Sequence, residues 1–144
     1  MTAPLPSRYL TATQTALRIA AGLTFFSHGA AKLFGWFGSD GKTVELMSRF
    51  GAAGVIETVA GACIILGAAT RVMAFIASGE MAVAYFWMHV ARGETSNLWW
   101  WANHGELPML YAFIWLLFAA WGAGPFSVDE WMRKRRAAPG PAGG

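Results

Sequence analysis

The sequence predicts an all-α fold, namely an integral membrane four-helix bundle with a short amphipathic C-terminal helix. Composition is the first reason: 56% of the 144 residues are hydrophobic and 13% are charged, against about 45–50% and about 25% in ordinary globular chains. The second reason is that the apolar residues gather in four stretches of roughly 20 residues, the length that a helix needs to cross a bilayer. A chain of this length holds four such helices and their loops, so we expect one membrane domain.

Turn-forming residues such as Gly35 and Gly67 separate the four expected spanning helices. These helices cover residues 10–31, 51–69, 72–91 and 107–124. The first contains polar residues, including Arg18, that interrupt the apolar core a secretory signal needs, so we expect it to be retained. The last contains no charge, and Asn103 and Glu106 before it have the spacing of a capping box.

The C-terminal segment predicts the short amphipathic helix. Ser127 and Glu130 again have the spacing of an N-terminal cap, and four basic residues follow at 133–136. Proline and glycine dominate the last six residues, a composition typical of a disordered tail. The predicted organisation is an N-terminal cytoplasmic segment, a four-helix transmembrane domain, and a basic juxtamembrane segment with a disordered tail. These parts cover residues 1–9, 10–131 and 132–144.

The distribution of lysine and arginine predicts the orientation of the helices. If both termini are cytoplasmic, that side holds six basic residues and the outer side holds four. Cytoplasmic loops are richer in basic residues, so we expect both termini in the cytoplasm. The six are Arg8, Arg71 and Arg133 to Arg136, and the four are Lys32, Lys42, Arg49 and Arg92. No folded polar face remains for these residues to cover, which argues against nucleic-acid binding.

Charged residues inside the predicted spans are the most informative ones, because each costs about 2.5–3.5 kcal/mol to insert. Arg18 and Glu80 each lie about eight residues, or roughly 12 Å, from the inner ends of their helices. Opposite charges at matching depth predict an ion pair that joins the two helices. The alternative is that the pair takes up protons or binds a ligand.

A second polar group is expected toward the outer side, centred on His28, Glu57 and His89. Glycines flank Glu57 at helical spacing, which places its carboxylate between helices rather than toward lipid. Either it is hydrogen-bonded there for packing alone, or it belongs to a site. The candidate ligand-binding residues are Arg18, His28, Lys32, Glu57, Glu80, His89, His104 and Glu106.

Other chemistries are disfavoured by spacing and composition. No pair of histidine, cysteine or carboxylate residues has the spacing that places two metal ligands on one helix face, so we expect no metal site. Cys63 is the one cysteine, which excludes dithiol exchange within the chain. Trp36 and Trp99 to Trp101 fall on the outer side, where they form either an interfacial belt or a lid over a site.

Five segments resemble the DoxX family of small bacterial and archaeal membrane proteins, in matching order. The similar residues are Arg18, Gly22, Phe25, His28, Gly29 and the Lys-Leu-Phe-Gly of 32–35; Glu57 and Gly61; Gly79 to Phe86 with His89; Asn103 to Glu106; and Gly122 to Asp129. The resemblance runs from about residue 15 to about residue 130. It implies a four-helix, multi-pass protein of the bacterial or archaeal cytoplasmic (inner) membrane. Family members have been linked to thiosulfate:quinone oxidoreduction and to membrane oxidoreductase assemblies that handle thiol or oxidative stress.

Three functions remain open at this stage, and with them whether the chain is an enzyme. The first is a redox-associated subunit that binds a quinone or a small sulfur anion in an outward-side polar pocket, with no covalently bound cofactor. The second is a non-catalytic structural or docking subunit of a larger membrane complex. The third is a carrier of protons or a small solute, which a four-helix chain would need to build as a homo-oligomer. Expected partners are membrane lipid and other membrane or redox proteins.

Overall fold

A computed structural model describes residues 6–93 and 97–137 of the chain. The described residues form helices and no strands, which confirms the predicted all-α class. The elements are α1 (Ser7–Phe34), α2 (Arg49–Leu66), α3 (Thr70–Ala84), η1 (Tyr85–Ala91), α4 (Glu106–Trp121) and α5 (Val128–Ala137). The predicted domain boundaries stay predictions, and the predicted tail at 139–144 lies outside the described residues.

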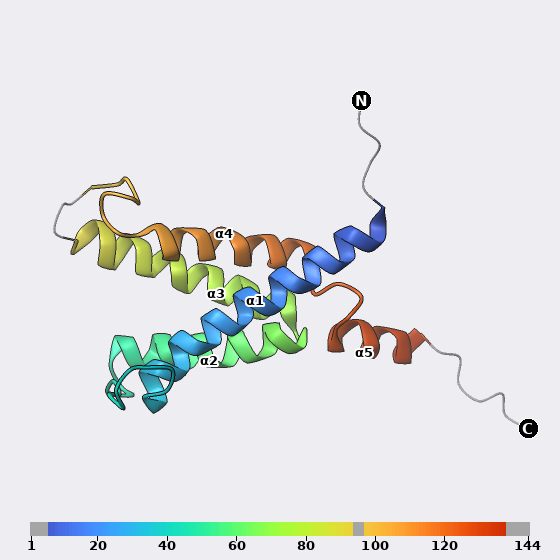
Figure 1. Cartoon of the computed structure of the whole chain (residues 1–144), viewed down its shortest axis with the longest axis horizontal. Coiled ribbons are helices and arrows are strands. Elements are labelled where there is room, and N and C mark those ends of the chain that lie inside the picture. The colour runs from blue at the N-terminus through green and yellow to red at the C-terminus, as the bar shows by residue number, and fades with distance from the viewer. Residues whose placement is uncertain (1–5, 94–96, 138–144) are drawn as a thin grey trace, which may run out of the picture.

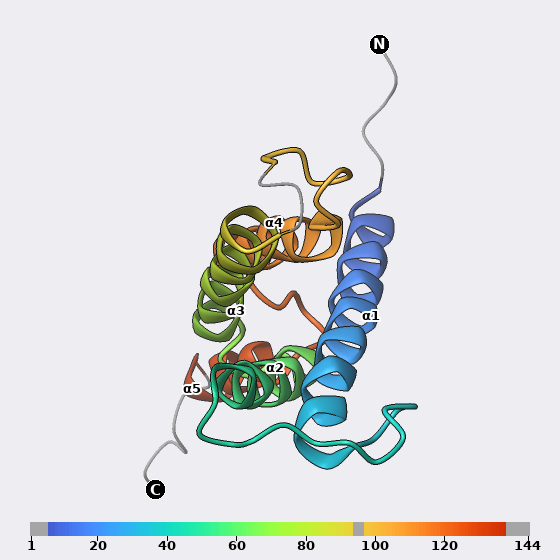
Figure 2. The same cartoon turned by 90° about the vertical axis from the view of Figure 1, so that its left-hand side faces the viewer.

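The four long helices form two pairs. α1 packs along α2 and α3 packs along α4, while α2 and α3 share a smaller interface (Figures 1 and 2). The start of α1 and the whole of α5 lie at one end of the bundle, and the α1–α2 and η1–α4 loops lie at the other (Figure 1). We call these the α5 end and the loop end.

Glycines allow α1 and α2 to approach closely. A Cβ atom on Gly29 would lie 2.5 Å from the Thr58 backbone nitrogen, and one on Gly61 would lie 2.7 Å from the Phe26 nitrogen. Gly54 similarly faces Leu33. The predicted small-residue face around Glu57 is therefore confirmed as the contact with α1.

Aromatic side chains join α1 to α4 in the core. The ring centroid of Phe25 lies 5.2 Å from that of Trp115, and Tyr111 stacks on Trp115 at 5.6 Å. The Tyr111 hydroxyl also donates a hydrogen bond to Thr24 on α1. Alanines at the α3 side of this core, Ala74 and Ala77, are fully buried, so the chain packs tightly where the two helix pairs meet.

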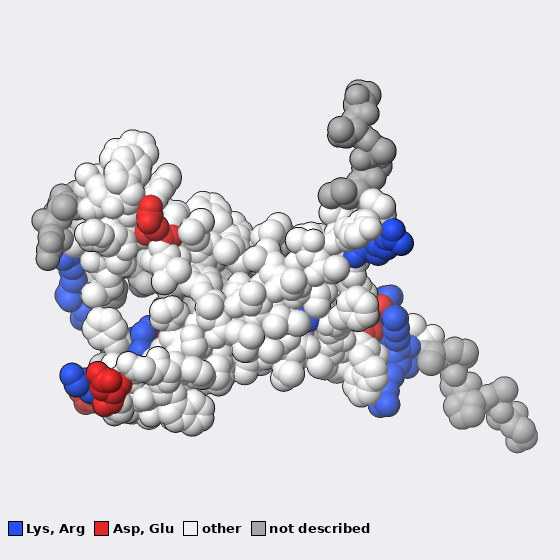
Figure 3. Space-filling view, in the orientation of Figure 1, with Lys and Arg blue, Asp and Glu red and all other residues white. Residues whose placement is uncertain are grey.

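The outward surface between the two ends is apolar. Lysine, arginine and acidic side chains gather at the α5 end and the loop end, and the middle of the view is almost free of them (Figure 3). Large apolar side chains face outward on every long helix, among them Leu23, Val59, Phe75 and Phe113. Of the described helices, α2 alone is clearly long and apolar enough to cross a membrane, with a mean hydropathy of 1.6.

Several helix ends lie where the sequence predicts them, but the start of α4 and the end of the third predicted helix differ from the prediction. Gly35 and Gly67 end α1 and α2 in the left-handed conformation, as their positions between apolar stretches indicate. The capping box at the start of α4 is wrong: Gly105 is the N-cap, and the Asn103 Oδ1 accepts a hydrogen bond from the Gly105 N–H within the preceding turn. The third predicted helix is also not uniform, because its last seven residues are a π-helix.

α5 is tied to the turn between α2 and α3. The Asp129 carboxylate accepts hydrogen bonds from the backbone N–H groups of Ala69 at 2.7 Å and Thr70 at 2.9 Å, while the Asp129 N–H donates to the Gly67 carbonyl. Asp129 therefore satisfies backbone donors at the start of α3 that no side chain of the turn itself satisfies.

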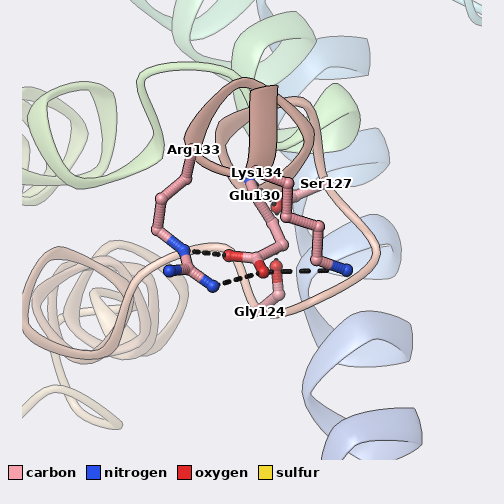
Figure 4. A network of polar contacts seen from close by, with 5 residues as sticks. All are labelled: Gly124, Ser127, Glu130, Arg133 and Lys134. Atoms are coloured by element: carbon pink, nitrogen blue, oxygen red, sulfur yellow. Dashed lines mark hydrogen bonds and ion pairs between the residues drawn. The ribbon is translucent and has the colours of Figure 1, made fainter. Parts of the chain in front are cut away.

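The predicted start of α5 at Ser127 is confirmed. Its hydroxyl accepts from the Glu130 N–H at 3.2 Å and donates to the Gly124 carbonyl at 2.6 Å (Figure 4). The Glu130 carboxylate then accepts two hydrogen bonds from Arg133, each 2.7 Å long, which lower the pKa of Glu130 below its ordinary value. Lys134 adds a longer ion pair at 3.8 Å.

The predicted ion pair between Arg18 and Glu80 is wrong. The Arg18 guanidinium instead donates to the backbone carbonyls of Ile64 and Ile65 at 2.6 and 2.5 Å, and to that of Phe126 at 2.7 Å. α1 begins beyond the end of α2, so Arg18 lies level with the C-terminal turn of α2 (Figure 1). Glu80 lies ten residues beyond the start of α3, about 15 Å along that helix.

We expect Arg18→Leu to lower the free energy of unfolding in detergent by about 3 kcal/mol, because it leaves helix-end carbonyls without a donor. Arg18→Lys should recover part of the loss. Since Arg18 and Glu80 share no partner, Arg18→Leu and Glu80→Leu should be additive within about 0.5 kcal/mol in a double-mutant cycle. Denaturant titration of the four proteins measures this, and a coupling well above that value would restore the ion pair.

Asp129→Ala should destabilise the protein by about 1 kcal/mol, the usual cost of losing a helix cap. Glu45→Ala is the matched control, because Glu45 is an exposed carboxylate in the α1–α2 loop with no ion pair among the described residues and no positive φ. Thermal unfolding in detergent compares the two variants. Equal melting temperatures would show that Asp129 does not hold α5 against the start of α3.

Candidate functional site

A cleft of about 920 Å³ opens at the loop end, between α2 on one side and α3 with η1 on the other. The space-filling view is hollowed between these elements, with basic side chains beside the opening (Figure 3). Most of the wall is apolar and includes Phe50, Ile56, Met81 and Met88. The charged lining residues are Lys32, Arg49, Glu57, Glu80 and Arg92. A largely apolar cleft with few polar groups is typical of a small-molecule site.

An ion pair forms one part of the cleft wall. The Lys32 ammonium, in the last turn of α1, lies 2.6 Å from both carboxylate oxygens of Glu57 on α2. Glu57 is 3% exposed, whereas the Lys32 side chain is 29% exposed. The close packing of α1 on α2 through Gly54 brings the two side chains together. Lys32 therefore keeps an accessible side toward the cleft while it neutralises the buried carboxylate.

Glu80 contributes a second carboxylate to the same cleft, from α3. Its Oε2 atom is buried and forms no hydrogen bond with the described residues. A buried polar atom without a partner costs free energy, and a ligand that supplies the missing hydrogen bond recovers it. Within this cleft Glu80 is thus the side chain best placed to recognise a polar group on a ligand.

Two arginines and a tryptophan form the mouth of the cleft. Arg49 begins α2, Trp87 lies in η1, and Arg92 follows η1. The Cζ atoms of Arg49 and Arg92 lie 4.3 and 5.4 Å from the centroid of the Trp87 ring. Both are cation–π contacts, which hold the guanidinium groups beside the opening.

The structure brings three of the eight predicted site residues together: Lys32, Glu57 and Glu80. His28 is exposed on α1 and is not part of the cleft wall. The Nδ1 atom of His89 is hydrogen-bonded to the Asn103 carbonyl at 3.0 Å, also away from the cleft wall.

The remaining predicted residues lie elsewhere. Arg18 lies at the α5 end, His104 is exposed in the loop before α4 with φ at +58°, and Glu106 is the exposed first residue of α4. Trp99 to Trp101 contact one another in the same loop and do not line the cleft. Among the described residues, no group of three histidine, cysteine or acidic side chains is placed to hold a metal ion.

Sequence reasoning missed Arg49, Trp87 and Arg92 as site residues. The two arginines served only to count charges for the orientation, and Trp87 was one aromatic residue among many in an apolar stretch. Arg49 begins α2 and Arg92 follows η1. Because successive spanning helices run in opposite directions, their places in the sequence do indicate that both arginines lie at the same end of the bundle. The π-helix that carries Trp87 has no sequence signature that marks it, although such segments are frequent at functional sites.

The comparison with known proteins agrees with the resemblance described above. Residues 13–90 match the DoxX family. An uncharacterized protein of Haemophilus influenzae is 42% identical over 118 residues, which cover 79% of this chain and 86% of that protein. No solved structure matches the chain. The match covers more than half of the chain and includes Lys32, Glu57 and Glu80, so the protein belongs to the DoxX family.

Proposed function

We propose that this chain is an inner-membrane subunit of a quinone-linked or thiol/sulfur redox system, and that it binds a quinone headgroup in the cleft at the loop end. One observation carries the proposal: the buried Oε2 of Glu80 has no partner among the described residues and belongs to a mostly apolar cleft. A quinone ring needs an apolar slot and hydrogen-bonding groups at its oxygens. The residues present fit both needs.

Different side chains of the cleft would contact the quinone headgroup and its apolar tail. Glu80 donates a hydrogen bond to a carbonyl oxygen when it is protonated, and accepts one from a hydroxyl when it is ionised. Lys32 offers a further donor while Glu57 holds its ammonium in place. Phe75 and Val83 line the cleft and face outward, so an apolar tail leaves between α2 and α3 toward lipid.

The bound quinone would supply the electron-accepting chemistry. The chain's single cysteine provides no dithiol, so electrons would come from a redox partner protein. The proposed part of this chain is to position the headgroup, to exclude water and to exchange protons at Glu80.

The membrane arrangement belongs to the same proposal. DoxX proteins are generally membrane-associated, and α2 meets the length and hydropathy of a span. We propose that α1, α3 with η1, and α4 cross as well, with both termini cytoplasmic. Two features support this arrangement. Apolar side chains face outward on all four helices. The starts of α1 and α3, which carry Arg8 and Arg71, lie at the same end as the basic helix α5 (Figure 1).

A docking subunit is the second candidate function, and one observation favours it. Trp99, Trp100 and Trp101 are exposed and pack on one another with ring centroids 5.1–6.4 Å apart, outside the cleft wall. Exposed aromatic clusters are frequent at contacts with other proteins. Under this alternative the cleft would be empty of quinone and the tryptophans would contact a larger membrane complex.

We expect Glu80→Leu to weaken binding of a short-tail ubiquinone about tenfold, because one hydrogen bond to the headgroup is worth roughly 1.4 kcal/mol. Glu80→Gln, which keeps a donor and an acceptor, should bind much more tightly than Glu80→Leu. Titration of the purified protein in detergent measures the dissociation constants.

Glu106→Leu is the matched control for this titration, because it removes an exposed carboxylate outside the cleft. Thermal unfolding accompanies each titration. Since the buried Oε2 of Glu80 has no described partner, Glu80→Leu should keep the melting temperature of the native protein. Equal ubiquinone affinity in Glu80→Leu and the native chain would refute the quinone site.

The proposed topology predicts which thiols a membrane-impermeant reagent reaches. In a Cys63→Ala background, Lys42→Cys should be labelled from outside intact cells, whereas Arg136→Cys should be labelled only after the cells are opened. Both positions are exposed, so access depends on the side of the membrane alone. Labelling of Arg136→Cys alone in intact cells would reverse the orientation, and labelling of both variants would contradict the three spans proposed between these two positions.

A further inference from the structure

We propose that Arg49, Trp87 and Arg92 form a binding site for the phosphate group of an anionic phospholipid, with one acyl chain lying along the apolar wall of the cleft. The site is the mouth of the cleft and differs from the proposed quinone contacts at Glu80 and Lys32. It rests on the proposed membrane location, but not on quinone binding.

The first argument is the convergence of two cations on one ring. Because the Cζ atoms of Arg49 and Arg92 lie 4.3 and 5.4 Å from the Trp87 centroid, they are at most about 10 Å apart. They come from different elements, the start of α2 and the residue after η1, so the fold itself brings them together. Two like charges held against one ring repel each other, and an anion bound beside them reduces that repulsion.

The second argument is the geometry that the tryptophan imposes. A guanidinium held against an indole ring keeps its N–H edge free for hydrogen bonds, and that planar edge matches two oxygens of a phosphate. Arg49 also stands at the N-terminus of α2, where the helix dipole favours an anion. The Ser48 hydroxyl accepts from the Gly51 N–H at 3.0 Å and fixes this first turn.

The third argument separates a lipid from a free anion. Met47, Phe50 and Met88 line the same cleft as the two arginines, and all three are exposed apolar side chains. A free phosphate would leave this wall uncovered, whereas a phospholipid covers it with an acyl chain. A zwitterionic headgroup brings its own cation toward the arginines, so an anionic phospholipid fits better.

The test uses the full chain, purified and reconstituted in discs with equal amounts of phosphatidylglycerol and phosphatidylethanolamine. Native mass spectrometry then measures the lipid that stays bound after release. We expect phosphatidylglycerol to be retained in preference, and Arg49→Gln with Arg92→Gln to lower its retention about tenfold. The matched control, Lys42→Gln with Arg136→Gln, removes the same charge from exposed sites away from the cleft and should retain the lipid.

Further variants distinguish a specific phosphate-binding site from non-specific electrostatic attraction of anionic lipid. Arg49→Lys with Arg92→Lys keeps the charge but loses the planar edge, so it should retain clearly less lipid than the native chain. Retention equal to the native chain would overturn the proposal, as would an equal loss in the matched control. Inorganic phosphate that binds the lipid-free protein as tightly as the lipid would also overturn it.

Glu80→Leu separates this proposal from the proposed function. That variant should keep phosphatidylglycerol at the native level, because Glu80 is not one of the residues that hold the phosphate. If the native chain does not bind ubiquinone but retains phosphatidylglycerol, the lipid site is supported and the quinone site is refuted. If it binds ubiquinone but does not retain phosphatidylglycerol in preference, the quinone site is supported and the lipid site is refuted.

Discussion

The close approach of α1 and α2 is the constraint on which the rest of the structure depends. Glycines at the crossing remove the Cβ atoms that would keep the helices apart, and Gly29 meets the Thr58 backbone directly. This contact fixes the register of α1, which then places Lys32 against Glu57 at the loop end and Arg18 against the last turn of α2 at the α5 end. One packing choice thus sets the partners of three charged side chains.

The two helix pairs meet tightly near the middle and leave the cleft at the loop end. Phe25, Trp115 and the buried alanines of α3 hold the pairs together in the core. Toward the loop end the wall between α2 and η1 is made of larger side chains, such as Phe50 and Trp87, which border the cleft instead of filling it. The opposite end is closed by Asp129 and Arg18, which bind the final segment to the α2–α3 turn.

The positions of the helices could be predicted from the sequence, whereas most of the side-chain contacts between helices could not. Apolar stretches, glycines and the Ser127 cap predicted the helices, because these signals are local. The Arg18–Glu80 pair failed because depth was counted from an expected helix start, whereas α1 is a 28-residue helix that begins beyond α2. Lys32 and Glu57 were placed in one region correctly, since glycine spacing reports which face of a helix is in contact. The π-helix and the Arg49–Trp87–Arg92 contacts depend on tertiary packing and have no local signal.

The different contacts of Arg18 and Glu80 explain why we assign Arg18 a structural role and place Glu80 in the proposed site. An arginine has several donors, and a helix C-terminus offers carbonyls without intrahelical partners, so both terminal nitrogens of Arg18 donate to backbone carbonyls and only its Nε is left without a partner among the described residues. A carboxylate needs donors, and the backbone N–H groups in the middle of neighbouring helices are already used. Glu57 obtains its donor from Lys32, while the Oε2 of Glu80 finds none among the described residues. In a helical bundle of this kind, a carboxylate oxygen that faces a cleft without a hydrogen-bond donor is therefore a better candidate for a ligand contact than a buried arginine whose terminal nitrogens are all used.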